Sequence, residues 1–159
     1  TPLAPVDKEL KTAVILVNGF NGLGLHTLFN TIKFFGKEFK NFIFVQVGVV
    51  DAGNFKGISE VERLKIQVQE DVSKYVKYMH SQGLHAAGVA CVGIDAIGEV
   101  ENASLEIVKQ YPNAIFFGGK LVFPEESFWT RLLHNNTVFA IQQRFYSKGL
   151  PFVILPIRV

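Results

Sequence analysis

Residues 12–24 of the chain read TAVILVNGFNGLG. The apolar, largely β-branched run over residues 12–17 is typical of a strand that is buried on both faces of a sheet. That run ends at Asn18, and from Gly24 to Phe35 apolar residues recur at helical spacing before Gly36 stops the helix. A buried strand that turns through glycines into an amphipathic helix is the opening unit of an α/β fold.

The same alternation continues to the end of the chain. Ser59 and Glu62 match a capping box at the start of a helix whose apolar face runs from Ile58 to Met79, and Gly83 ends it. Asp95 is a natural N-cap for the next helix. The residues expected to face inward on that helix are Ile97, Val100, Leu105 and Val108. Further strands are predicted over residues 42–50, 84–94, 114–117 and 152–157, with a last helix from about Pro124 to Ser147.

Five predicted strands alternate with four predicted helices, which favours right-handed crossovers. The fold class is therefore α/β, with a single doubly wound, mainly parallel five-stranded sheet and helices on both faces. The domain is predicted over residues 11–159, after a linker over residues 1–10 that contains two prolines. Gly118 and Gly119 are interpreted as the start of a loop, and prolines on both sides of the last strand place it at an edge.

The composition limits the classes of function. The 159 residues, 48% of them hydrophobic, are enough for one domain with a substantial core. A net charge of +2 excludes a dedicated nucleic-acid binder. Cys91 is the only cysteine, which excludes an internal disulfide partner and a multi-thiolate zinc site. The apolar runs fall far short of the roughly 20 residues needed to cross a bilayer, so no spanning segment is predicted within the chain.

In a sheet of this kind, ligands bind beyond the carboxyl ends of the strands. The loop after the first strand contains Gly19, Gly22 and Gly24, and backbone N–H groups at such a helix start suit a phosphate. Asp51, after the second strand, stands where a dinucleotide fold places its ribose-binding acid. The glycine order is GxxGxG and not GxGxxG, however, and a tight turn from strand to helix needs glycine in any case. Of the functions considered for this chain, an NAD-dependent oxidoreductase is therefore the least favoured.

The usual signatures of catalysis and metal binding are missing from the sequence. Gly118-Gly119-Lys120 departs from a phosphate loop, because Ala114 and Leu121 stand where that loop requires Gly and Ser or Thr. The four histidines show no ligand spacing, and no serine lies in a GxSxG motif. Cys91 falls inside an apolar strand, where a thiol is inert. These features predict a domain that is not an enzyme and holds no metal.

Two surface features each allow two interpretations. Lys33, Lys37 and Lys40 recur near the end of the first helix and form either a solvated face or a basic stripe for anionic partners. The aromatic segment from Leu121 to Trp129 either covers the end of the sheet or forms an interaction patch.

The chain also resembles known families over nearly its whole length. The alternating element order, the glycine-rich turn and the string TRLLHNNT (130–137) before the last strand resemble the universal stress protein fold. More specifically, three strings resemble the C-terminal cytosolic domain of bacterial permeases of the amino acid-polyamine-organocation superfamily. These strings are VNGFNGLGLHT (17–27), VVDAGNFKG (49–57) and LPFVILP (150–156), the last preceded by RFY (144–146).

The resemblance implies a nucleotide grip that this sequence has largely lost. Nucleotide-binding universal stress proteins carry an acid at the end of strand 1 and a GxxG, spacer, G-Ser/Thr pattern after strand 4. Here Asn18 replaces the acid, the second spaced glycine is missing after Gly118-Gly119, and His134-Asn135 replaces the final Gly-Ser. The bulk of histidine implies loss of the ATP grip, although a pocket can remain. The candidate ligand-binding residues are Asn18, Gly19, Gly22, Gly24, Asp51, Gly118, Gly119, His134 and Asn135.

These observations predict a non-catalytic regulatory or assembly domain of a membrane amino-acid or cation permease, on the cytoplasmic side of the inner membrane. Its expected partners are the transmembrane part of the parent permease and a second copy of the chain. The dimer is expected through the apolar edge over residues 152–159, because related folds pair there across a two-fold axis. No cofactor is expected. The alternative is a free-standing universal stress protein-like protein that binds an adenine nucleotide.

Overall fold

The computed structural model describes residues 3–54, 56–122 and 128–158, with the backbone alone described at 23, 36, 120–122, 128–137 and 157–158. Its centre is a five-stranded sheet in the order β3-β2-β1-β4-β5 with every neighbouring pair parallel. This confirms the predicted doubly wound α/β class. The strands are β1 (Thr12–Leu16), β2 (Asn41–Val49), β3 (His85–Gly93), β4 (Ala114–Val122) and β5 (Phe152–Arg158).

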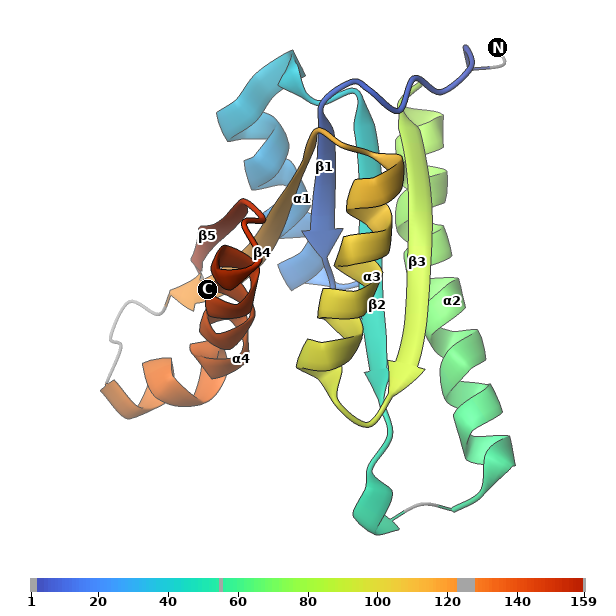
Figure 1. Ribbon diagram of the computed structural model, residues 1–159, viewed down its shortest axis with the longest axis vertical. Coiled ribbons are helices and arrows are strands. Elements are labelled where there is room, and N and C mark those ends of the chain that lie inside the picture. The colour runs from blue at the N-terminus through green and yellow to red at the C-terminus, as the bar shows by residue number, and fades with distance from the viewer. Residues whose placement is uncertain (1–2, 55, 123–127, 159) are drawn as a thin grey trace.

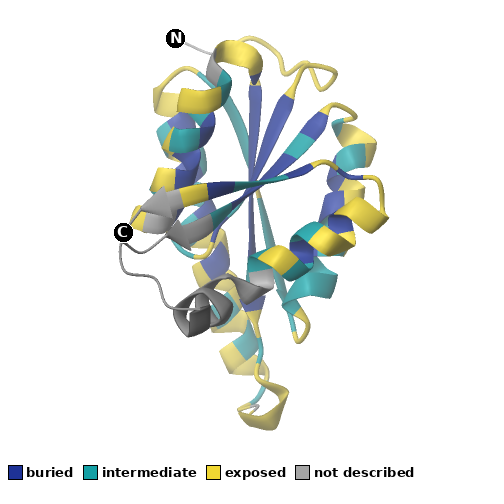
Figure 2. Ribbon diagram, turned by 90° about the vertical axis from the view of Figure 1, so that its left-hand side faces the viewer, coloured by how far each residue is buried: buried dark blue, intermediate teal, exposed yellow. Residues whose placement is uncertain are grey.

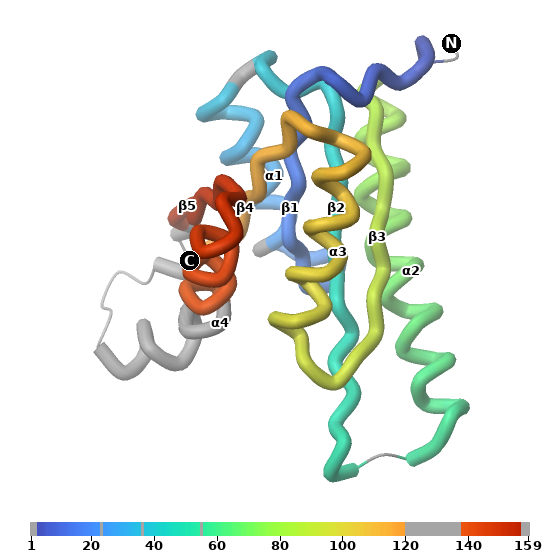
Figure 3. The backbone as a smooth tube through the Cα atoms, viewed as in Figure 1, coloured from blue at the N-terminus to red at the C-terminus, as the bar shows by residue number. Residues whose placement is uncertain are grey.

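Four helices cover the two faces of the sheet. α1 (Gly22–Phe35) and α2 (Ile58–Ser81) lie on one face, and α3 (Ala96–Gln110) and α4 (Phe128–Ser147) lie on the other (Figure 1). Two short 3-10 turns, η1 (Gly36–Glu38) and η2 (Ala52–Asn54), follow α1 and β2. The chain path from β2 through η2 to α2 projects beyond the carboxyl ends of the other strands (Figure 3).

The core consists of two layers because side chains of a strand alternate between its faces. Ala13 and Ile15 of β1 pack toward α1 and α2 with Tyr75, whereas Val14 packs toward α3 and α4 with Phe116. All of these residues are fully buried, and the inner strands form the buried centre of the molecule (Figure 2). The apolar run over residues 12–17 is therefore explained by the burial of β1 on both faces of the sheet.

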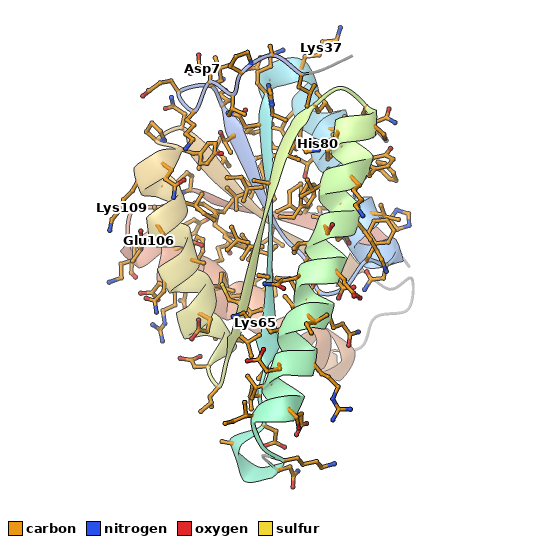
Figure 4. The ribbon with its side chains drawn as sticks, turned by 90° about the vertical axis from the view of Figure 1, so that its right-hand side faces the viewer. Asp7, Lys37, Lys65, His80, Glu106 and Lys109 are labelled. Carbon is orange, nitrogen blue, oxygen red and sulfur yellow. The ribbon has the colours of Figure 1, made fainter. Side chains whose placement is uncertain are left out.

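The edge strands are β3 and β5, so the predicted edge position of the last strand is confirmed. At the amino ends of the strands, the Asn41 side-chain amide donates to the Asp7 carbonyl oxygen (2.8 Å) and the Lys8 ammonium lies over the Tyr111 ring (5.6 Å). Asp7 and Lys37 lie at this end of the sheet in Figure 4. The segment predicted as a linker thus contacts the domain through residues 7 and 8.

Several local predictions were wrong. Gly118 and Gly119 do not open a loop, because β4 continues through them and pairs with Ile154 and Leu155 of β5. The capping box is not formed: Gly57, at φ 108°, is the N-cap of α2 and provides no side-chain hydrogen bond.

The inward faces of two helices also differ from the prediction at single positions. Ile58 is 77% exposed, because the first turn of α2 lies on the part of the chain that projects past the sheet. Leu105 is 37% exposed, since the buried face of α3 passes through Val100, Ser104 and Ile107. The predicted start of the last helix at Pro124 lies outside the described residues. Within the part of the chain that the structure describes, none of the helices is both long and apolar enough to cross a membrane.

Candidate functional site

A cleft of about 700 Å³ lies at the carboxyl ends of β1, β2 and β4. Val17 follows β1, Gly48 belongs to β2 and Gly119 belongs to β4, and all three line it. The strand order reverses between β1 and β4, since the chain builds β1, β2 and β3 toward one edge and then β4 and β5 toward the other. Such a reversal leaves a crevice in which open α/β sheets bind their ligands.

The β1–α1 loop forms one wall of the cleft. Gly19 has a left-handed backbone (φ 81°), which glycine adopts without the strain that a Cβ brings. Its N–H group donates to Gln46 Oε1 at 2.9 Å, and Gln46 is 5% exposed. A buried amide must satisfy its polar atoms within the protein, and the loop supplies that partner. The Gly19 amide is therefore already occupied by the side chain beneath it.

Asn21 caps the start of α1. Its Oδ1 accepts the Gly24 N–H at 3.0 Å, and its Nδ2 donates to the Asn18 carbonyl at 2.6 Å. An Asn at this position satisfies one of the backbone donors that a helix start leaves without a partner. The amides of both Gly19 and Gly24 thus bind side chains of the chain itself.

Gln46 links the loop to α2. Its Nε2 donates to Asp71 Oδ2 at 3.0 Å, on the opposite side from the bond that its Oε1 accepts from Gly19. Asp71 is half-buried and lines the cleft. A hydrogen-bonded chain therefore runs from the α2 carboxylate through β2 to the β1–α1 loop.

Tyr75, one turn after Asp71 on α2, fixes the same loop from the other side. The phenol is fully buried and donates to the Gly19 carbonyl at 2.8 Å. Burial raises the pKa of Tyr75 above its ordinary value and the Asp71 carboxylate acts in the same direction, against a lowering effect of the Asn21 backbone. The phenol therefore remains a protonated donor at neutral pH.

Gly24 is required because Tyr75 approaches it so closely. A Cβ on Gly24 would lie 1.9 Å from the phenol oxygen and 2.9 Å from Cζ. Gly118 is required for a similar reason on the other face, where a Cβ would lie 2.8 Å from Val138 and 2.9 Å from Phe152. Gly24 therefore serves the close approach of α2 to the start of α1, and Gly118 serves the packing of α4 and β5 on β4.

The structure brings five of the nine predicted site residues together. The residues that line the cleft are Asn18, Gly19, Gly24, Gly118 and Gly119. Gly22 is exposed at the first position of α1 and is not part of the lining. Asp51 is exposed beyond β2, where its carboxylate accepts the Gly53 N–H (2.9 Å) and the Asn54 side-chain amide (3.1 Å). His134 and Asn135 belong to α4, but their side chains lie outside the described residues.

Two important residues of the cleft were missed by the sequence analysis. Gln46 interrupts an otherwise apolar buried run, which is a signal because a buried amide requires a partner. Asp71 lies on α2 immediately beside the buried positions Val68 and Val72, so a carboxylate at that place has to face a polar space. Neither signal identifies the partner, because Gln46 and Asp71 are 25 positions apart in the sequence.

Other candidate chemistry does not gather at the cleft. Burial raises the pKa of the Cys91 thiol and the Glu99 carboxylate adds to this, so Cys91 is a weak nucleophile at neutral pH. Among the described residues, no group of three or more His, Cys, Asp or Glu side chains could hold a metal ion. Lys33, Lys37 and Lys40 are all exposed, which leaves both interpretations of that stripe open. The side chains of the aromatic segment from Leu121 to Trp129 lie outside the described residues.

Comparison with known proteins supports the fold. No protein-family model and no curated protein matches the sequence. Among solved structures, the chain is similar to the crystal structure of a protein from the universal stress protein family from Burkholderia pseudomallei, with a TM-score of 0.58 and 12% identity. The match covers 96% of this chain and 100% of that chain. At this identity the likeness shows the fold alone, so the predicted universal stress protein-like fold is confirmed and the permease origin stays a prediction.

Proposed function

We propose that the chain is a non-catalytic regulatory or assembly domain of a membrane amino-acid or cation permease. In this role it lies on the cytoplasmic side of the inner membrane, with the transmembrane part of the permease as its partner. The observation that carries the proposal is a ligand-sized cleft in which the N–H groups of Gly19 and Gly24 already bond to side chains of the chain itself. The cleft is large enough for a small molecule, but the N–H groups of Gly19 and Gly24 do not point to a phosphate within it.

The occupied amides distinguish this cleft from a nucleotide grip. A phosphate at a helix start binds free backbone N–H groups. Here the N–H of Gly19 bonds to Gln46 and the N–H of Gly24 bonds to Asn21. Asp71, a carboxylate in the lining, adds repulsion for any phosphate that enters. Both features favour a ligand other than a nucleotide phosphate.

The permease-like strings support the membrane context. Two of them, residues 17–27 and 49–57, lie far apart in the sequence but begin at the same edge of the sheet, at the carboxyl ends of β1 and β2. Residues 17–27 also contain Asn18, Gly19 and Gly24 of the cleft. The resemblance therefore covers segments that a ligand or a partner at this end would contact.

The proposal is tested by following the native gene product. An antibody raised against the 159-residue chain should detect a protein much larger than 17.7 kDa. That protein should stay in the membrane fraction after a high-pH carbonate wash, which strips peripheral proteins. A soluble species near 17.7 kDa, with nothing retained in the washed membranes, would contradict the proposal.

We also propose that the domain forms homodimers through β5. Among the strands that the structure describes, β5 lies at the edge of the sheet with β4 as its neighbour. The carbonyl of Phe152 accepts from Gln142 and Tyr146. The carbonyl of Pro156 accepts from Asn30, and Pro156 has no N–H, so the contact between copies is through side chains more than through a continuous ladder. Leu155 is buried by the rest of the chain, and Val153 and Ile154 are partly buried against the two cores. Pairing of two such edges across a two-fold axis is a closed, self-complementary arrangement.

The alternative function is a free-standing protein that binds an adenine nucleotide. It is favoured by one observation, the position of the 700 Å³ cleft at the point where strand order reverses. Calorimetry with ATP, AMP, cyclic dinucleotides and NAD separates the two functions. Saturable micromolar binding that requires the phosphates favours the alternative, and flat traces with all four ligands count against it.

A further inference from the structure

The cleft has two halves of different polarity. The half against α3 and α4 is lined by aliphatic side chains, and the half against α1 and α2 carries the polar ones beside Leu64 and Val68. The aliphatic lining includes Leu16, Val45, Val47, Ala96, Val100 and Ile141. The polar lining includes Asn18, Asn21, Gln46, Gln67 and Asp71. A ligand that matches both halves has one polar end and one apolar body.

Asp71 sets the charge of the polar half. Among the described residues that line the cleft, it is the one that carries a formal charge. Its Oδ2 accepts from Gln46 Nε2 at 3.0 Å, and within the described residues no ion pair engages its carboxylate. A half-buried carboxylate that holds one neutral hydrogen bond keeps most of its charge available for a cation.

The backbone donors reinforce this preference. An anionic ligand would need N–H groups, but those of Gly19 and Gly24 are directed to Gln46 Oε1 and Asn21 Oδ1. The side-chain amides of Asn18 and Gln67 can both donate and accept, so the charge of the polar half comes from Asp71, whose second carboxylate oxygen accepts no hydrogen bond within the described residues. A cationic end is therefore favoured over a neutral end and over an anionic end.

We propose that the cleft binds an organic cation, with its ammonium group against Asp71 and its apolar body against the aliphatic half. The inference rests on the proposed function only in taking the cleft as the sensing site of the domain. It names the chemical class of the signal as an amphipathic amine, which the polarity of the cleft distinguishes from a nucleotide.

Three probes that share a phenylethyl body test the charge preference. The 159-residue chain is titrated by calorimetry with 2-phenylethylamine, 2-phenylethanol and 3-phenylpropanoate, which present a cation, a neutral group and an anion on one phenyl body. The amine should bind at least about tenfold more tightly than the alcohol, as for a hydrogen bond to a charged partner. The acid should bind most weakly. Raising the salt concentration should weaken amine binding and leave alcohol binding unchanged.

A pair of neighbouring variants locates the effect. Asp71→Asn keeps the shape and can still accept from Gln46, so it should abolish the difference between amine and alcohol. Glu70→Gln is the matched control, because Glu70 is the adjacent carboxylate of α2, is exposed and is not part of the lining. It should retain the difference in full. Circular dichroism of each variant verifies its fold.

Three outcomes would overturn the inference: no binding by any probe, equal binding of amine and alcohol by the unaltered chain, or an unchanged preference in Asp71→Asn. The comparison of probes on the unaltered chain decides the matter even where a variant fails to fold. The outcome is also separate from that of the membrane-fraction experiment. Amine binding by a chain whose native product is soluble would refute the permease context and leave the ligand class standing.

Discussion

Replacing Gly24 by alanine should destabilise the domain, because Tyr75 occupies the space of the new methyl group. The added Cβ would lie 1.9 Å from the phenol oxygen, so the ring must move by more than about 1 Å to reach an ordinary contact. The ring has little room to move. Tyr75 is fully buried, stacked on Phe44 with centroids 4.9 Å apart and in edge contact with Phe20 at 4.8 Å.

The expected cost follows from three contributions. Overpacking of a filled site costs about 1–3 kcal/mol. Movement of the ring also breaks the bond from the Tyr75 hydroxyl to the Gly19 carbonyl, which is worth about 1 kcal/mol. Alanine in place of glycine in a helix returns up to about 1 kcal/mol. The free energy of unfolding of Gly24→Ala should therefore fall by about 1–3 kcal/mol, measured by urea denaturation followed by circular dichroism.

Two companion variants isolate the cause. Gly22→Ala adds the same methyl group in the first turn of the same helix, where no atom of the described residues lies within 4 Å of it, so it should be neutral or stabilising by up to about 1 kcal/mol. Tyr75→Phe removes the oxygen that Gly24→Ala would meet. The double variant should therefore be more stable than the sum of the single effects by at least about 0.5 kcal/mol. Strict additivity, or a Gly24→Ala protein as stable as Gly22→Ala, would refute the reasoning.

Two further predictions concern pH and assembly. The raised pKa of Tyr75 means that the folded state favours the protonated phenol, so its stabilisation relative to Tyr75→Phe is complete below the ordinary pKa of about 10 and is lost as pH rises through the raised value. The difference in urea midpoint between the two proteins should therefore shrink above pH 10 or so, and a difference that stays constant would contradict this. Pairing through β5 predicts a species of twice 17.7 kDa by light scattering at micromolar concentration, and a pure monomer would exclude the dimer.

The order and type of the strands and helices could be predicted because a strand that is buried on both faces of the sheet is an unbroken run of apolar residues. β2 was expected over residues 42–50 and occupies Asn41–Val49, since its residues 42–45 are all buried and all apolar. Helix ends at glycine were predicted equally well: Gly83 (φ 74°) follows α2, where a left-handed residue is needed. Each of these signals lies within a few consecutive residues, so it can be recognised from the sequence without knowledge of distant contacts.

Contacts between distant residues account for what could not be predicted. Gly118 and Gly119 have the composition of a loop, but their conformation is decided by pairing with Ile154 and Leu155 of β5. Close packing of Val138 and Phe152 around Gly118 then makes glycine a requirement of the strand. Composition alone does not separate a glycine that turns the chain from one that lets a helix approach it.

The β1–α1 loop shows most clearly why the fold and the ligand have to be argued separately. Its glycines and its place before α1 are those of an anion site, and from the sequence alone the amide of Gly19 is a candidate phosphate donor. One side chain from the neighbouring strand changes that interpretation. Gln46 Oε1 accepts the Gly19 N–H, and Gln46 Nε2 donates to Asp71. The backbone of the turn is kept, while the N–H groups of Gly19 and Gly24 bond to side chains of the chain and the Asp71 carboxylate lines the cleft. The sign of the charge that the cleft prefers therefore depends on Gln46 and Asp71, and the three phenylethyl probes measure that sign directly.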